Sequence, residues 1–174
     1  MGAPSIIQRF NITKGVDMDK KTIKAILDVI KDVSDRPGLY GAQFIGSALG
    51  NFLFFTDGYV CIRLDVEEFP HELVDKYWVS GDQLKEIYKK MGAKDYATSF
   101  KNDGGTHPDW LECWRTWTNV ESTTDPVPIR PETFKKLAPF GDMLMTVNEN
   151  KLGQKNILFS GKGINAVAMP LAHL

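Results

Sequence analysis

The sequence predicts an α+β fold in which antiparallel sheets carry packed amphipathic helices. A β-prone run, a cap or turn signal and a lysine-bearing helix occur together three times, over residues 10–33, 76–91 and 127–137. Strand-like stretches follow each copy, and such recurrence indicates an architecture built by repetition. Apolar residues within the copies repeat at helical spacing, and a tight turn signal separates two apolar runs, as in a β-hairpin.

Length and composition are those of an ordinary globular domain. The chain has 174 residues, of which 43% are hydrophobic and 25% charged, enough to build one core. We expect a single domain over 1–174, with approximate repeats over 6–70, 74–118 and 125–174. The net charge of −1 gives no overall sign of nucleic-acid binding, so only the distribution of charge can indicate it.

The first repeat opens with partial strand alternation over residues 6–13. Asp17 and Asp19 are candidate helix caps, and the apolar residues from Ile23 to Val33 recur at helical spacing. The Arg-Pro-Gly sequence at 36–38 predicts the end of this helix.

A hairpin is predicted next, around Asp57-Gly58. Both residue types tolerate turn conformations, and the flanking runs 52–55 and 59–64 are strongly apolar.

The second repeat combines a strand over 74–79 with a capped helix. Ser80 and Gln83 have the spacing of a capping box, and the apolar stripe runs from Leu84 to Met91.

The segment after this helix carries three tryptophans, Trp110, Trp114 and Trp117. Their spacing suits one helix face, whereas the Trp, Thr and Val content suits a strand, so both assignments stay open. The aromatic group could stack bases or bind a partner, but packing in the core or between subunits is the more economical interpretation.

The third repeat begins at Pro131, which suits the first position of a helix. Pro139 and Gly141 predict its end, and strands are expected over 143–147, 156–160 and 164–169.

No catalytic constellation is present. The three histidines His71, His107 and His173 lack metal-ligand spacing, and Cys61 and Cys113 suit buried free thiols. The carboxylate of Asp57 is explained by its turn. We therefore expect a non-enzymatic protein without metal or cofactor.

The N-terminus shows no secretory signal, and no apolar run approaches the length of a membrane helix. A soluble, cytoplasmic protein without membrane contact is expected.

Lysines fall on exposed rows of all three predicted helices. Such rows usually mark solvated faces, but three on equivalent elements favour phosphate contact. The candidate DNA-facing residues are Lys20, Lys24, Lys31, Lys85, Lys89, Lys135 and Lys136.

Four segments, in order, resemble the bacterial DNA polymerase sliding clamp (β clamp) family. Residues 55–59 resemble its "TDGHRL" strand turn, and 77–84 its next strand and helix start. Residues 107–110 resemble its "FPDY" segment, and 166–171 its terminal "VVMPMRL". The resemblance implies DNA-clamp-like repeats of strand, helix and strands, in a shortened chain of phage type.

The resemblance also implies an apolar pocket for peptides of DNA polymerase or clamp-loader type. Its lining, carried over by position, would be Thr56, Gly58, Tyr59, Val60, Pro108, Trp110, Met169, Pro170 and Leu171. Tyr59 and Val60 replace the family's His-Arg, so the rim carries less charge.

Two functions follow from these expectations. The first is a sliding-clamp-like processivity or docking factor in DNA replication or repair, which binds duplex DNA without reading sequence and can form a homo-oligomer. The alternative is a monomeric clamp mimic, which binds clamp partners or modulates host replication without encircling DNA.

Overall fold

The computed structural model describes residues 18–48, 50–66, 76–91 and 107–169. The strand expected over 6–13 lies outside these residues. In the described parts no helix is long and apolar enough to cross a membrane.

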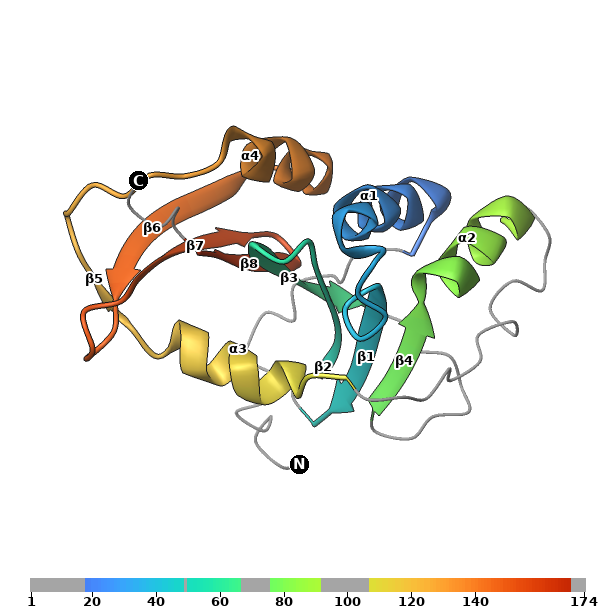
Figure 1. Ribbon diagram of the computed structural model, residues 1–174, viewed down its shortest axis with the longest axis horizontal. Coiled ribbons are helices and arrows are strands. Elements are labelled where there is room, and N and C mark those ends of the chain that lie inside the picture. Colours follow the sequence, from blue (N-terminus) through green and yellow to red (C-terminus); the bar gives the residue numbers. More distant parts are fainter. Residues whose placement is uncertain (1–17, 49, 67–75, 92–106, 170–174) are drawn as a thin grey trace, which may run out of the picture.

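One antiparallel sheet of eight strands forms the centre of the molecule (Figure 1). Its order is β4-β1-β2-β3-β8-β7-β6-β5, and every strand pairing in it is antiparallel. The strands are β1 (Gly41–Ser47), β2 (Gly50–Thr56), β3 (Val60–Val66), β4 (Lys76–Ser80), β5 (Glu121–Ser122), β6 (Met143–Glu149), β7 (Lys155–Gly161) and β8 (Ile164–Ala168). The predicted α+β class is confirmed.

Four α-helices of the described residues cover the two faces of this sheet. They are α1 (Lys20–Ile30), α2 (Gly81–Lys90), α3 (Trp110–Thr118) and α4 (Pro131–Leu137), with short 3₁₀ helices at Lys31–Val33 and Ala138–Phe140. Figure 1 shows α1, α2 and α4 in a row on one face and α3 on the other. The sheet therefore buries side chains on both faces.

The sheet order is symmetric about the pair β3 and β8. The succession α1-β1-β2-β3 fills one half, and α4-β6-β7-β8 fills the other. In the predicted middle repeat, over 74–118, β4 and α2 are followed by the helix α3 within the described residues.

Local sequence signals explain where the helices begin. Asp19 Oδ1 accepts a hydrogen bond from Thr22 N at 2.7 Å, and Ser80 Oγ accepts one from Gln83 N at 3.2 Å. Both side chains satisfy amides that have no partner inside the helix. Gly81 allows a close approach, because a Cβ there would lie 2.3 Å from the Tyr40 ring.

Alternation along the strands divides the core into two clusters. On the face of α1, α2 and α4, Ile62 and Leu64 of β3 pack with Ile26 and Leu84. On the face of α3, Cys61 packs with Trp110 and other aromatic residues. β3 is thus buried on both sides, which makes it the centre of the core.

The assignment left open for the tryptophan segment is a helix. Asp109 Oδ1 caps it by accepting from Glu112 N at 3.2 Å. Trp110 and Trp114 are buried against the sheet, while Trp117 is half-buried. The prediction from the four-residue spacing, which places side chains on one helix face, was right, and the prediction from β propensity was wrong.

We expect Leu64→Ala to lower the free energy of unfolding by about 2–5 kcal/mol, because a cavity replaces a fully buried side chain in β3. The matched control is Leu152→Ala, at a side chain that is 83% exposed. Its effect should stay within about 0.5 kcal/mol. Urea denaturation followed by circular dichroism measures both, and equal losses would contradict the assignment of β3 to the core.

Candidate functional site

The turn between β2 and β3 is held by its own side chains. Asp57 Oδ1 accepts from the backbone N–H groups of Tyr59 and Val60, each at 2.8 Å. Thr56 Oγ1 donates to Val60 O at 2.8 Å and accepts from Gly58 N at 3.0 Å. Gly58 has a φ of 94°, which favours glycine. The predicted hairpin is confirmed, and four side-chain hydrogen bonds close its turn.

A buried ion pair connects this turn to two helices. Lys136 Nζ of α4 binds Oδ2 of Asp57, whose side chain is 5% exposed, and also Oδ2 of Asp32 in the 3₁₀ helix that follows α1. Burial alone would lower the pKa of Lys136, but the hydrogen bonds to both carboxylates outweigh it and raise that pKa. The sequence-based expectation that Lys136 points outward is corrected, because its side chain is only 13% exposed.

The turn lies next to the end of β8. Val60 is the cross-strand partner of Ala168, and Met169 N donates to Tyr59 O at 3.0 Å. Both neighbouring side chains reach solvent, since Tyr59 is 48% and Met169 39% exposed. Two segments of the predicted pocket, more than a hundred positions apart in the chain, therefore meet in one place.

A cation that no sequence pattern indicated lies against the Tyr59 ring. The guanidinium of Arg130 lies 3.5 Å from the centroid of the Tyr59 ring. Arg130 directly precedes Pro131, the first residue of α4, and this position does not reveal that its side chain reaches Tyr59. The charge that the Tyr59-Val60 pair lacks is thus supplied from another element. We call Tyr59, Arg130 and Met169 the turn patch.

Three other members of the predicted pocket, Thr56, Val60 and Trp110, contribute little surface. Val60 is fully buried, Thr56 is 5% exposed and Trp110 is 3% exposed within the aromatic cluster under α3. Pro108 is half-buried next to the start of α3. Pro170 and Leu171 lie outside the described residues.

The tryptophans of α3 form part of the core. The Trp114 ring meets the Phe54 ring edge-on, with 5.8 Å between centroids. The guanidinium of Arg63 lies 5.3 Å from the centroid of the Trp114 ring and 4.8 Å from that of the Phe52 ring. Burial lowers the pKa of Arg63, and Asp65 offsets part of this effect. The Arg63 guanidinium therefore lies between two aromatic rings, and Trp114, buried in this packing, is not available to stack on a ligand.

The predicted lysines all lie on the layer formed by α1, α2 and α4 or on the 3₁₀ turn after α1 (Figure 1). On these elements lysines outnumber carboxylates, although the whole chain carries a net charge of −1. The lysines are Lys20, Lys21, Lys24, Lys31, Lys85, Lys89, Lys90, Lys135 and Lys136, against Asp28, Asp32, Asp82, Glu86 and Glu132. This layer, which we call the helical face, is more positive than the rest of the chain.

Several of these lysines are engaged by neighbouring carboxylates. Lys24 pairs with Asp28 at 2.9 Å, Lys89 with Glu86 at 3.0 Å, and Lys85 with Asp82 at 3.6 Å. Lys20 lies 4.9 Å from the centroid of the Tyr88 ring.

Of the predicted DNA-facing lysines, two have neither an ion pair nor an aromatic ring beside them among the described residues. Lys31 and Lys135 are exposed and form no ion pair within the described ranges.

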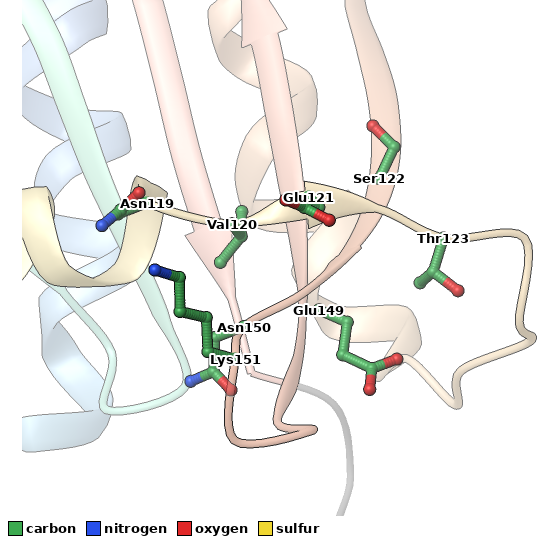
Figure 2. A pocket seen from close by; sticks show the side chains of 8 residues that line it. All are labelled: Asn119, Val120, Glu121, Ser122, Thr123, Glu149, Asn150 and Lys151. Carbon is green, nitrogen blue, oxygen red and sulfur yellow. The ribbon is translucent and has the colours of Figure 1, made fainter.

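A polar pocket of about 340 Å³ lies at another place, beside β5 and the β6–β7 turn (Figure 2). It is lined by Asn119, Val120, Glu121, Ser122, Thr123, Glu149, Asn150 and Lys151. None of these residues belongs to the predicted peptide pocket. Val120 is the one apolar side chain among these eight, and the others carry amides, hydroxyls or opposite charges, so the pocket offers no cluster of apolar side chains to a peptide anchor.

No group of three His, Cys, Asp or Glu side chains that could hold a metal ion occurs among the residues that the structure describes. Cys61 is buried, and that burial raises its pKa, so the thiol is held protonated. The His107 ring stacks on Trp78 with 3.8 Å between centroids.

The fold is similar to that of solved sliding clamps. No family model matches the chain. Among solved structures, it superposes on the Helicobacter pylori β clamp bound to a DNA ligase peptide with a TM-score of 0.54 and 13% identity, covering 88% of this chain and 63% of that one. For DNA polymerase III subunit β from Borrelia burgdorferi, in complex with a natural product, the TM-score is 0.53 and the identity 13%, and the match covers 92% of this chain and 64% of that one. The chain thus spans somewhat less than two thirds of these clamps, and the likeness shows a clamp-like fold.

We expect Asp57→Ala to lower the free energy of unfolding by about 2–4 kcal/mol, because two turn amides and Lys136 lose a buried partner. Asp57→Asn should lose less, since its amide oxygen can still accept from both N–H groups. Asp125→Asn, which affects the more exposed pair with Lys155, is the control and should cost at most about 1 kcal/mol. Thermal or urea denaturation measures all three. Similar values for Asp57→Ala and Asp125→Asn would refute the structural role of the turn.

Proposed function

We propose that this chain is a non-enzymatic, sliding-clamp-like protein that acts as a processivity or docking factor in DNA replication or repair. The observation that carries the proposal is the junction of β3 and β8, which brings Tyr59 and Met169 together on a clamp-like fold. With it we retain the sequence-based expectation of a cytoplasmic protein of phage type.

The turn patch would bind short peptides of DNA polymerase or clamp-loader type. Tyr59 and Met169 offer an aromatic and a flexible apolar contact, both exposed. Arg130 adds a cation beside them, which suits a peptide with an acidic or carbonyl-rich flank. Pro170 and Leu171 follow Met169 directly in the chain and extend the predicted apolar lining.

The helical face would contact duplex DNA through its lysines. Lysine contacts to phosphate are electrostatic and independent of base sequence. Lys31 and Lys135 are the strongest candidates, since neither is neutralised by a carboxylate of the described residues. Concentration of positive charge on one layer of a slightly acidic chain supports this assignment.

A second function is favoured by the ion pairs on the same face. Lys24, Lys85 and Lys89 already have carboxylate partners, which weakens the field that DNA would meet. A monomeric clamp mimic, which binds clamp partners through the turn patch, needs no positive field for DNA, so lysines neutralised by carboxylates are compatible with it. DNA affinity separates the two functions, because only the first requires it.

We expect the protein to bind labelled duplex DNA weakly and without sequence preference, with an affinity that falls steeply as salt rises. The double variant Lys31→Gln/Lys135→Gln should reduce the slope of log affinity against log salt by about 2, since two phosphate contacts are lost. Lys151→Gln/Lys162→Gln, with exposed lysines outside the helical face, is the matched control. Fluorescence anisotropy measures the binding. A salt-independent signal, or equal effects of both double variants, would exclude the helical face as the DNA contact.

We expect this protein to bind a fluorescent copy of the DNA ligase peptide that is bound to the Helicobacter pylori clamp. Met169→Lys and Tyr59→Ala should each weaken binding roughly tenfold or more, because each removes an exposed anchor contact. Leu152→Lys, at an exposed residue of the β6–β7 turn, is the control and should bind as the unchanged protein does. Unchanged binding by both turn-patch variants would move the peptide site elsewhere.

A further inference from the structure

The two cysteines of the chain lie on either side of the contact between α3 and the sheet. Cys61 belongs to β3 and packs in one buried cluster with Trp110 and Trp114 of α3. Cys113 lies on α3, between these two tryptophans in the sequence. Figure 1 shows α3 on the face of the sheet opposite to α1, α2 and α4. Two free thiols from distant parts of the chain are thus brought to one contact between a helix and a strand.

Cys113 lies close to the buried face of α3. Residues three positions apart on a helix have Cβ atoms roughly 5–6 Å from each other, so Cys113 is the neighbour of Trp110 on the helix surface. The Trp110 side chain is 3% exposed and packs in the cluster that contains Cys61. Cys113 itself is half-buried, as expected at the border of the buried face. The helix therefore holds Cys113 at the edge of the layer in which Cys61 is packed.

The two thiols are also electrostatic neighbours. Burial is the main cause that raises the pKa of Cys61, and the charge of the Cys113 thiolate raises it further. Because the interaction between two charges weakens with distance, this contribution indicates that the two sulfur atoms lie near each other. It agrees with the packing of both residues against the same tryptophans.

We propose that Cys61 and Cys113 form a reversible disulfide that links α3 covalently to β3. In the reduced protein α3 is held by packing, and in the oxidised protein by packing and a covalent bond. A disulfide requires Cα atoms roughly 4.4–6.8 Å apart, which is the approach that a helix packed directly on a strand provides. In a reducing compartment such a bond forms when oxidants accumulate, so it makes the contact between α3 and β3 sensitive to redox conditions.

The oxidant is a small disulfide, for which oxidised glutathione is the probe. The more accessible thiol, Cys113, loses its proton, and its Sγ attacks one sulfur of the oxidant. The S–S bond of the oxidant breaks and one glutathione thiolate leaves. Cys61 then loses its proton, its Sγ attacks the Cys113 sulfur of the mixed disulfide, and a second glutathione thiolate leaves. The two protons end on the released thiolates, so two protein thiols are oxidised and one small disulfide is reduced.

The order of these steps follows from burial. Cys61 is buried and cannot meet the oxidant directly, whereas Cys113 is partly accessible. Burial and the carboxylates of Asp109 and Glu112 raise the pKa of Cys113, so little of it is thiolate at neutral pH. The exchange is therefore slow at neutral pH, and the experiment is carried out at mildly alkaline pH.

The proposal does not rest on the proposed function. The disulfide is measured in the absence of DNA and peptide, and it can fail to form in a protein that binds both. Binding of DNA or peptide can likewise fail in a protein that forms the disulfide.

Intact-mass spectrometry of the full-length protein after treatment with oxidised glutathione tests the bond. We expect the chain to lose the mass of two hydrogen atoms and to regain it with dithiothreitol. Cys113→Ser should stay unmodified, because its remaining thiol is buried. Cys61→Ala should stop at a glutathione adduct on Cys113, because no second thiol resolves it. Circular dichroism confirms that each variant is folded.

Thermal denaturation measures the effect on the fold. The oxidised protein should melt about 5–10 °C above the reduced protein, because a covalent link between distant positions restricts the unfolded chain. The same treatment should leave the melting temperature of Cys113→Ser unchanged, which makes this variant the matched control.

Three results would overturn the proposal. The first is a protein that keeps both thiols after oxidation. The second is a glutathione adduct or a covalent dimer through Cys113 that persists in the unchanged protein, since it would place Cys61 out of reach. The third is a disulfide that forms no faster in the folded protein than in urea, because the fold would then not bring the two thiols together.

Discussion

The pairing of β3 with β8 is the constraint on which the rest of the structure depends. It joins two four-stranded halves into one sheet, with Val60 opposite Ala168 and Leu64 opposite Ile164. Because β3 is buried on both faces, the pair lies at the centre of both core clusters. The same pairing places the β2–β3 turn beside the end of β8, which creates the turn patch. It also places α1 beside α4, which brings the lysines of both helices onto the helical face.

Polar interactions at this junction add specificity to the hydrophobic core. One carboxylate oxygen of Asp57 accepts hydrogen bonds from two amides of the turn, and the other oxygen pairs with Lys136. A single side chain therefore couples a local turn to the docking of α4 against α1. Removing one partner of such a buried pair costs more than the pair contributes net, because the remaining charge is left without compensation. The turn geometry that carries Tyr59 is thus linked to helix packing.

Periodicity predicted most elements of the fold correctly. The apolar stripe from Ile23 to Val33, the Asp57-Gly58 hairpin and the strands over 143–169 appear at or near the expected positions, because a side-chain pattern with one buried face specifies its own secondary structure. The tryptophan segment was ambiguous, since spacing and β propensity disagreed. For the candidate site, the sequence indicated the turn and Met169, but it could not find Arg130, which reaches Tyr59 from another element. Nor could it distinguish Lys136, buried in an ion pair, from its exposed neighbour Lys135.

By itself, the sequence determined what depends on neighbours within a few positions: helix caps, the stripe of each helix, the turn residues and the lysine content of the helices. Only the tertiary structure decided which elements share a face, which exposed residues are adjacent and which charges are compensated. The physical reason is that burial and ion pairing depend on side chains brought together from distant positions. The ring of Tyr59 lies against Arg130, and Lys136 lies between Asp32 and Asp57; both contacts follow from packing that no local pattern encodes.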